Sequence, residues 1–179
     1  MKTKLTVVGS VNMDLVTEAE VPPKLGETIL GLRFSLLPGG KGANQAVAAA
    51  RLGADVALVA CVGEDVFGER ALENLRSEGV RTEAVRIVSG ETTGTAAITV
   101  ANGENSIIVV PGANARLSDA DIRRAEAVLK ESAVVLLQLE IPMDSVLAAA
   151  RTAKEAGATV ILNPAPYRPL PEEIGRAHV

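Results

Sequence analysis

Short apolar runs alternate along this chain with segments whose apolar positions follow helical spacing. The runs are typical of buried strands and cover residues 5–8, 55–62, 133–140 and 158–163. Helical spacing predicts helices over 42–52, about 68–79, 119–130 and 141–156. Strands that alternate with helices pair in parallel through right-handed crossovers. The chain is therefore expected to be an α/β protein with a doubly wound, Rossmann-like, mostly parallel sheet.

Two stretches of the chain have a different, strand-rich texture. Residues 15–18 and 28–34 are predicted strands around a turn at 22–27, and residues 84–88, 95–100 and 106–110 are further predicted strands. Asn102-Gly103 separates the last two and is a strong hairpin signal. The first stretch stands between the first strand and the first helix, where a doubly wound unit normally has a short loop. It is therefore an addition to the plain doubly wound pattern.

A glycine-rich turn, Pro38-Gly39-Gly40-Lys41-Gly42, leads into the alanine-rich helix expected at 42–52. Glycine lets the backbone approach a ligand closely, and the helix N-terminus behind it is expected to aim unpaired N–H groups at that ligand. Lys41 and Asn44 add a cation and an amide, so the turn is a candidate site for a polyhydroxylated or anionic small molecule. Its spacing fits neither a Walker loop nor a dinucleotide fingerprint. A purely structural turn is the alternative interpretation.

Polar residues follow two of the predicted strands at their carboxyl ends. Asn12 and Asp14 come after the strand at 5–8, and Glu140 closes the strand at 133–140. Ligands of open α/β sheets collect beyond the carboxyl ends of the strands, so these side chains and the glycine turn are expected to converge. The alternatives are that Asn12 and Asp14 only form a turn and that Glu140 only favours a helix start.

Composition and charge narrow the classes of partner. The net charge is −4 and the aromatic residues are Phe34, Phe67 and Tyr167, so we expect no nucleic-acid partner. No apolar run is long enough to span a membrane and the N-terminus does not resemble a signal peptide, so we expect no membrane partner and a cytoplasmic location. The single cysteine, Cys61, excludes an internal disulfide and is expected to be a small buried hydrophobe.

Several of these motifs together resemble the PfkB family of ribokinase-like sugar kinases. The resemblance rests on Gly39-Gly40-Lys41-Gly42-Ala43-Asn44-Gln45-Ala46 with Gly53 and Gly63, on Asn12-x-Asp14, on Gln138-Leu139-Glu140 followed by Pro142, and on Asn163-Pro164-Ala165-Pro166. It implies a ribokinase-like fold in which segments of about 13–37 and 94–110 form a small β-sheet lid over the sugar. It also implies a homodimer formed through that lid.

The same resemblance implies a set of sugar contacts. The residues expected to bind the sugar are Asn12, Asp14, Gly39, Gly40, Lys41, Gly42, Asn44 and Glu140. Ile98 and Val100 alternate onto one face of a lid strand and are candidate contacts from above the sugar, with ordinary strand packing as the alternative. No residue of this chain is expected to be catalytic or to bind a metal.

The activity that the resemblance implies is ATP-dependent phosphorylation of D-ribose at its 5-hydroxyl, with Mg²⁺ and with a monovalent cation as a further candidate. The ATP-site motifs of the family, Asn-x-x-Glu and Gly-Ala-Gly-Asp with its catalytic Asp, do not occur in residues 1–179. We therefore expect residues 1–179 to be an incomplete domain, truncated on its C-terminal side and inactive alone. A kinase for another sugar or nucleoside and a non-catalytic sugar-binding module are the alternatives.

The final residues depart from the family pattern. Residues 173–179, Glu-Ile-Gly-Arg-Ala-His-Val, can be translated from a common sequencing-library adapter, so we expect a non-native tail. His178 is accordingly not a catalytic candidate.

Overall fold

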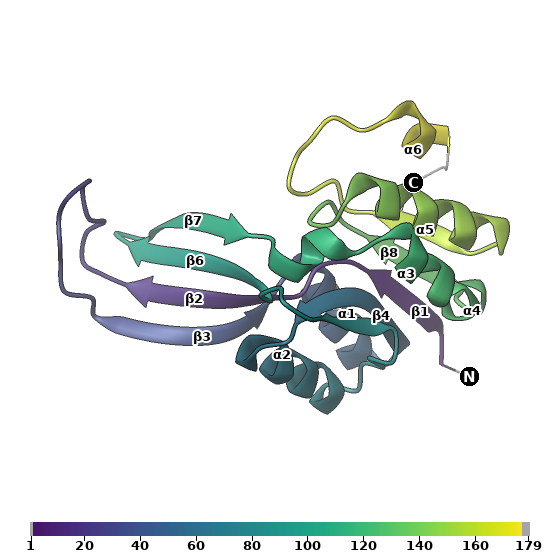
Figure 1. The fold of residues 1–179 in the computed structure, drawn as a ribbon, viewed down its shortest axis with the longest axis horizontal. Helices are drawn as coiled ribbons and strands as arrows, with labels where there is room; N and C mark the ends of the chain where they lie inside the picture. The colour runs from purple at the N-terminus through teal and green to yellow at the C-terminus, as the bar shows by residue number, and fades with distance from the viewer. Residues whose placement is uncertain (1, 177–179) are drawn as a thin grey trace.

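A computed structural model of the chain describes residues 2–176, and it contains two sheets (Figure 1). The larger, the core sheet, has five strands in the order β5-β4-β1-β8-β9, all paired in parallel. Its strands are β1 (Lys4–Val8), β4 (Asp55–Gly63), β5 (Val85–Val88), β8 (Val134–Leu137) and β9 (Thr159–Leu162). The predicted doubly wound α/β fold is confirmed.

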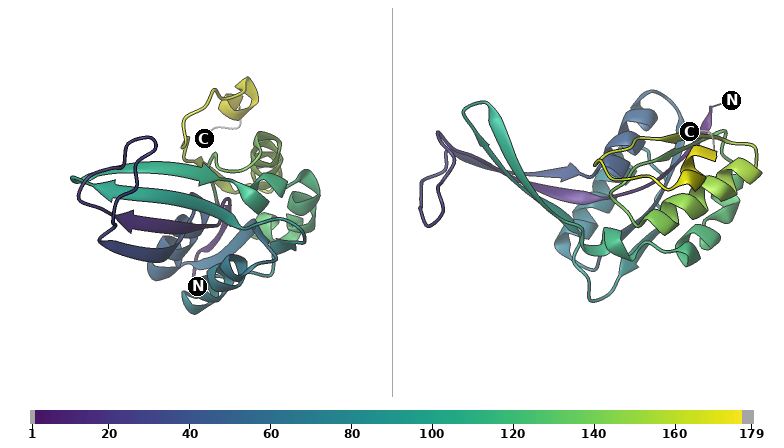
Figure 2. Two further views of the ribbon diagram at one scale, coloured as in Figure 1. Left: turned by 60° about the vertical axis from the view of Figure 1, so that its left-hand side comes forward. Right: turned by 90° about the horizontal axis from the view of Figure 1, so that it is seen from above.

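Helices cover both faces of the core sheet (Figure 2). On one face lie α1 (Lys41–Arg51) and α2 (Val66–Ser77), which pack on Val7 and Leu58. On the other face lie α3 (Asp119–Arg124), α4 (Glu126–Lys130) and α5 (Met143–Glu155), which pack on Val8 and Leu137. Successive strand residues therefore point to opposite layers, as strand geometry requires. Cys61 is fully buried in the second layer, as expected.

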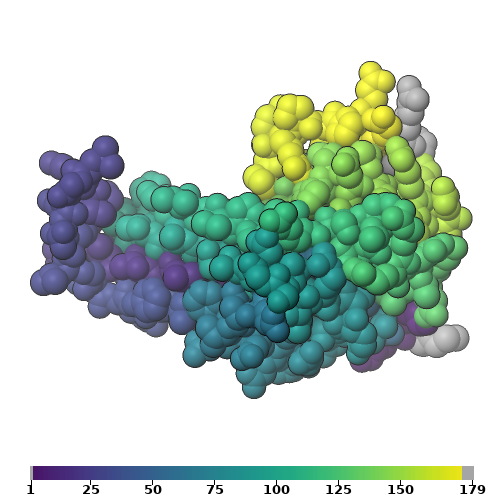
Figure 3. Space-filling model, viewed as in Figure 1, coloured from purple at the N-terminus to yellow at the C-terminus, as the bar shows by residue number. Residues whose placement is uncertain are grey.

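The smaller sheet, here the lid sheet, has four strands in the order β3-β2-β6-β7. They are β2 (Asn12–Glu18), β3 (Arg33–Gly39), β6 (Gly94–Ala101) and β7 (Glu104–Val110). Strands β2 and β6 pair in parallel, and the outer pairs are antiparallel. The lid sheet extends away from the core as an arm (Figure 3). The Asn102-Gly103 turn joins β6 to β7 with φ of 54° and 78°, the left-handed conformation that such hairpin turns need.

The structure corrects several predicted element boundaries. The strand expected at 28–34 is wrong, because pairing with β2 runs from Glu18↔Arg33 to Asn12↔Gly39 and so moves β3 towards the glycine turn. Pro38 is tolerated there because β3 is an edge strand. Asn12 and Asp14 lie in β2 rather than in a turn. The helix expected at 119–130 is divided at Ala125, and β5 joins the core sheet.

Two shorter elements complete the description. A 3₁₀ helix, η1 (Gly112–Arg116), follows β7 and returns the chain to the core, and α6 (Glu172–Arg176) packs near α5. The expected tail at 173–179 falls partly in α6, and residues 177–179 with His178 lie outside the described residues. No helix within 2–176 has both the length and the apolar character to cross a membrane.

Candidate functional site

The candidate site lies where the core sheet meets the lid sheet. The chain leaves β1 at Gly9, crosses the junction and enters β2 at Asn12; it returns through β3 and enters α1 at Lys41. Because Asn12 pairs with Gly39, the Asn-x-Asp segment and the glycine turn lie side by side. The predicted convergence of these two segments is therefore present in the structure.

The glycines of the turn are needed for close backbone packing. Gly40 has a φ of 90°, and a Cβ added there would lie 2.8 Å from the Asn12 nitrogen and 2.9 Å from the Ser10 oxygen. A Cβ on Gly42 would lie 2.5 Å from the Ser10 nitrogen. Residues 10–12 thus fill the space that side chains at Gly40 and Gly42 would occupy, so the structural interpretation of the turn holds for these two positions.

The N-terminus of α1 does not present unpaired N–H groups, which corrects the sequence expectation. Its N-cap, Gly40, supplies no side-chain hydrogen bond. Instead, Lys41 N donates to Glu140 Oε2 at 2.9 Å, and Gly42 N and Ala43 N donate to Ser10 Oγ and Ser10 O at 3.2 and 2.9 Å. The amides of the first turn are therefore used inside the protein, and the turn is poorly suited to a free anion.

Glu140 belongs to the third segment of the site. It lies in the loop after β8, because that strand ends at Leu137 and not at residue 140 as predicted. Its Oε2 accepts from Ser10 Oγ at 2.5 Å as well as from Lys41 N, and its Oε1 lies 3.9 Å from Lys41 Nζ. The Glu140 side chain is 17% exposed and that of Lys41 is 39% exposed. Glu140 is thus held at the start of α1 rather than at the start of the helix that follows it in the chain, α5, and it also lines the cleft at the junction.

Asp14 adds a second carboxylate to this place. A Cβ on Gly39 would lie 2.3–2.4 Å from the Asp14 carboxyl atoms, so glycine at 39 makes room for that carboxylate. Burial and the nearby negative charge of Glu140 both raise the pKa of Asp14 above its ordinary value. Within residues 2–176, no hydrogen bond to the Asp14 carboxylate is present. Asp14 is therefore a carboxylate with unused acceptor capacity, close enough to Glu140 to interact with it electrostatically.

The Asn12 side chain is oriented by a residue that the sequence analysis did not select. Asn114 Nδ2 donates to Asn12 Oδ1 at 2.7 Å, and Asn114 Oδ1 accepts from Val11 N at 2.8 Å. Gly94 permits this arrangement, because a Cβ there would lie 2.2 Å from Asn114 Nδ2. The Asn12 amide keeps its NH₂ group available as a donor. Asn114 ends the Pro-Gly-Ala-Asn stretch after β7, and Ser10 follows Gly9. A polar residue within two positions of a glycine was the only signal in the sequence for either residue.

The remaining predicted contacts fall into two groups. Cross-strand partners share a face, and Val16↔Ile98 and Glu18↔Val100 place both lid candidates on the Asp14 face of the lid sheet. Asn44, in contrast, is exposed and lines a groove of about 330 Å³ between α1 and α2. The structure therefore groups Ile98 and Val100 with Asp14 but does not place Asn44 with Asn12 and Glu140.

A cleft of about 410 Å³ opens at the junction. It is lined by Asn12, Asn114 and Glu140, by Val109 of the lid, and by residues of the C-terminal segment that include Pro166 and Arg168. Figure 3 shows the surface hollowed between the lid sheet and this C-terminal segment. The polar groups that line the cleft are the Asn12 and Asn114 amides, the Glu140 carboxylate and the Arg168 guanidinium, while Asp14 and Lys41 are not among its lining residues. A few polar groups in an otherwise apolar cleft suit a small molecule with several hydroxyl groups.

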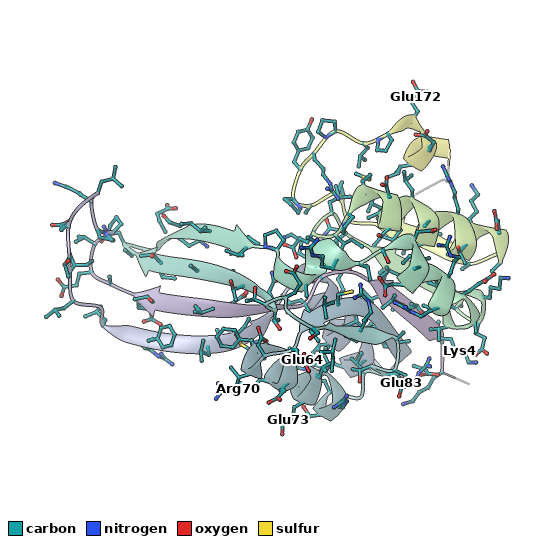
Figure 4. All side chains as sticks on the ribbon, in the orientation of Figure 1. Lys4, Glu64, Arg70, Glu73, Glu83 and Glu172 are labelled. Carbon is teal, nitrogen blue, oxygen red and sulfur yellow. The ribbon has the colours of Figure 1, made fainter. Side chains whose placement is uncertain are left out.

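Metal-ligating side chains do not cluster in the described part of the chain. Across residues 2–176, no group of three or more His, Cys, Asp or Glu side chains is arranged to hold a metal ion. The charged side chains labelled in Figure 4, such as Glu64 and Arg70, come from the core rather than the lid. Mg²⁺ is accordingly not assigned to the residues described.

Comparison with known proteins finds relatives among ribokinases and deoxyribokinases. The chain is 47% identical over 169 residues to ribokinase of Bacillus subtilis, covering 94% of this chain and 58% of that protein. It is 44% identical over 163 residues to deoxyribokinase of Salmonella typhi, covering 90% and 53%. The structure of Arabidopsis thaliana ribokinase complexed with ribose and ATP superposes with a TM-score of 0.86 at 39% identity, covering 97% of this chain and 57% of that one.

The chain thus spans a little over half the length of the relatives it matches. Its fold is that of ribokinases, with a parallel sheet and a separate small sheet. The sequence profile of the pfkB family carbohydrate kinases matches residues 2–178. On this match, the chain belongs to the pfkB family of carbohydrate kinases.

Proposed function

We propose that this chain is the sugar-binding and lid part of a kinase that phosphorylates D-ribose at its 5-hydroxyl with ATP. The observation that carries the proposal is the junction itself, where the Asp14 carboxylate, Glu140 Oε1 and the Asn12 NH₂ group retain hydrogen-bonding capacity. A neutral sugar offers hydroxyl groups that donate to the carboxylates and accept from the amide. Two carboxylates in one place disfavour a substrate that is already phosphorylated.

The proposed contacts divide between the two sheets. Asn12, Asp14 and the backbone at Gly39 and Gly40 hold the sugar from the lid side of the junction, and the side chains of Lys41 and Glu140 hold it from the core side. Gly42, whose N–H already donates to Ser10 Oγ, contributes only by allowing this close packing. Ile98 and Val100, on the Asp14 face, cover it with apolar surface. Asn44 stays a proposed contact only through rotation of its exposed side chain towards the turn.

ATP, Mg²⁺ and the catalytic base are proposed to be supplied by sequence that this chain does not contain. The Asn-x-x-Glu and Gly-Ala-Gly-Asp motifs are absent from residues 1–179, and phosphoryl transfer depends on such charge-stabilising groups. The chain alone is therefore expected to be inactive. A monovalent cation is assigned to the same missing part. A cytoplasmic location is part of the same proposal, and it is compatible with the use of ATP.

The lid sheet is also proposed to form a homodimer. Three apolar residues lie on the same face of the lid sheet as Asp14. Leu37 is the cross-strand partner of Asp14 in β3, and Val109 is the partner of Ala96, which itself pairs with Asp14. Ile107 pairs with Ile98 on that face. Leu37, Ile107 and Val109 are 51%, 50% and 48% exposed. Exposed apolar side chains that are contiguous on one face mark an interaction surface, and a second lid sheet offers a matching one.

A completed enzyme tests the proposed activity. Residues 1–172 of this chain, joined to the remainder of the B. subtilis ribokinase, are assayed for ADP release with D-ribose, 2-deoxyribose, other sugars and nucleosides. Activity that is highest with ribose supports the proposal. Activity that is highest with 2-deoxyribose favours a deoxyribokinase, the activity for which the S. typhi relative is named. A preference for another sugar or for a nucleoside favours a different kinase of the same family.

The non-catalytic alternative is tested on the chain itself. Calorimetric titration of ribose into the purified 179-residue chain measures binding without ATP. Tight binding by a stable chain whose completed form has no kinase activity favours a sugar-binding module. Weak binding that is strengthened in an active completed enzyme supports the kinase.

A further inference from the structure

Ser10 is the buried group on which the junction is centred, and no role has so far been assigned to it. It has no exposed surface and lies between the end of β1 and the start of β2. Its hydroxyl contacts two segments at once, since it accepts from Gly42 N at 3.2 Å and donates to Glu140 Oε2 at 2.5 Å. A hydroxyl is the simplest side-chain group that can do both.

These contacts determine which oxygen of Glu140 is available. With Gly42 N–H directed at Ser10 Oγ, the hydroxyl proton is left for Glu140 Oε2, which also accepts from Lys41 N at 2.9 Å. Oε2 therefore has two donors and is saturated within the protein. Among the described residues, Oε1 has the Lys41 ammonium, 3.9 Å away, as its only partner, and it is the oxygen left to accept from a ligand in the cleft that Glu140 lines.

We infer that Ser10 is a positioning residue for sugar recognition: it fixes the Glu140 carboxylate so that Oε1 accepts from a sugar hydroxyl, without itself touching the sugar. The inference rests on the proposed function. It differs from a purely structural role, because a serine that only capped α1 would stabilise the helix without affecting how Glu140 binds a ligand.

A double-mutant cycle separates the two roles. Ser10→Ala, Glu140→Gln and the double variant are titrated with ribose in the 179-residue chain, and their kinetics are measured in the completed enzyme. Ser10→Ala is expected to weaken ribose binding and raise KM about tenfold, with kcat changed less than about threefold. The double variant is expected to bind no more weakly than Glu140→Gln alone. Ser145→Ala is the matched control, because Ser145 is equally buried and donates one hydrogen bond, to Leu117 O, away from the cleft.

The outcomes separate the positioning role of Ser10 from the proposed function. The positioning role would be overturned if Ser10→Ala bound ribose with wild-type affinity, if it lost no more affinity than Ser145→Ala, or if the losses of affinity in the double variant were additive. Absence of sugar binding and turnover in the unsubstituted protein would overturn the proposed function, and the positioning role with it. If Ser10→Ala does not fold, Ser10→Cys replaces it, since a thiol, although larger than the hydroxyl, fills its place and donates only weakly, and the same outcomes apply.

Discussion

Replacing Asp14 by Asn should weaken sugar binding and stabilise the fold at the same time. The carboxylate is partly buried and close to the charge of Glu140, and both factors raise its pKa. An acid whose pKa is higher in the folded state binds its proton more tightly there than in the unfolded chain, so its ionisation at neutral pH lowers the stability. That penalty is relieved as the pH falls through the raised pKa towards the ordinary value of 3.8.

The size of each effect can be estimated. A hydrogen bond to a charged group contributes about 1.5–3 kcal/mol, so ribose should bind about 10- to 150-fold more weakly to Asp14→Asn. Relief of about 1 kcal/mol, the order of the interaction between two close unit charges that remain partly solvated, would raise the Tm by about 2–4 °C in a chain of this size. The Tm difference between variant and wild type should shrink as the pH is lowered to about 4.

Calorimetry with ribose and thermal unfolding followed by circular dichroism measure the two quantities. Asp119→Asn is the control, because Asp119 is an exposed partner of Arg123 on α3, remote from the junction. It should leave ribose affinity unchanged. Unchanged ribose affinity in Asp14→Asn would refute the role of Asp14 as a hydroxyl acceptor, and a lower Tm would refute the account of its charge.

Three further predictions follow from the same contacts. Gly39→Ala should cost little stability but weaken ribose binding about tenfold, because its Cβ displaces the movable Asp14 carboxylate. Gly42→Ala should lose about 1–3 kcal/mol in urea unfolding, because its Cβ meets the Ser10 backbone. Equal stability losses in the two variants would contradict this difference. Hydrogen bonds from Arg86, Ser118 and Arg124 lower the pKa of Asp121 despite its burial, so its carboxylate contributes stability above about pH 4 that is lost as the pH falls. Asp121→Asn should therefore cost about 3 kcal/mol of unfolding free energy at pH 7 and flatten the decline of stability in acid. An unchanged decline would refute this account. Ile107→Asp should shift the completed enzyme from dimer to monomer in light scattering. Ile87→Asp, similarly exposed on β5 at the edge of the core sheet opposite β9, should leave the dimer intact; a dimer in both variants would refute the lid interface.

Much of the fold could be predicted from the sequence because its signals are local. The apolar run before Gly9, the alanine-rich helix after the glycine turn and the Asn-Gly hairpin each express a preference carried by a few neighbouring residues. The boundaries of β3 were wrong because register, not local propensity, sets them: β3 must pair with β2 as far as Gly39 for the chain to reach α1. The break at Ala125 likewise has no local glycine or proline to announce it.

The candidate site was predictable only in part. The residue types and the strand ends that present Asn12, Asp14 and Glu140 were visible in the chain, since parallel strands bring their carboxyl ends to one edge. The use of each polar atom was not. Ser10 and Glu140 are 130 residues apart, and Asn12 and Asn114 are 102 apart. Only tertiary packing determines that the first amides of α1 donate to Ser10 and Glu140 instead of to a ligand. The physical reason is that a hydrogen bond depends on distance in space and not on order along the chain.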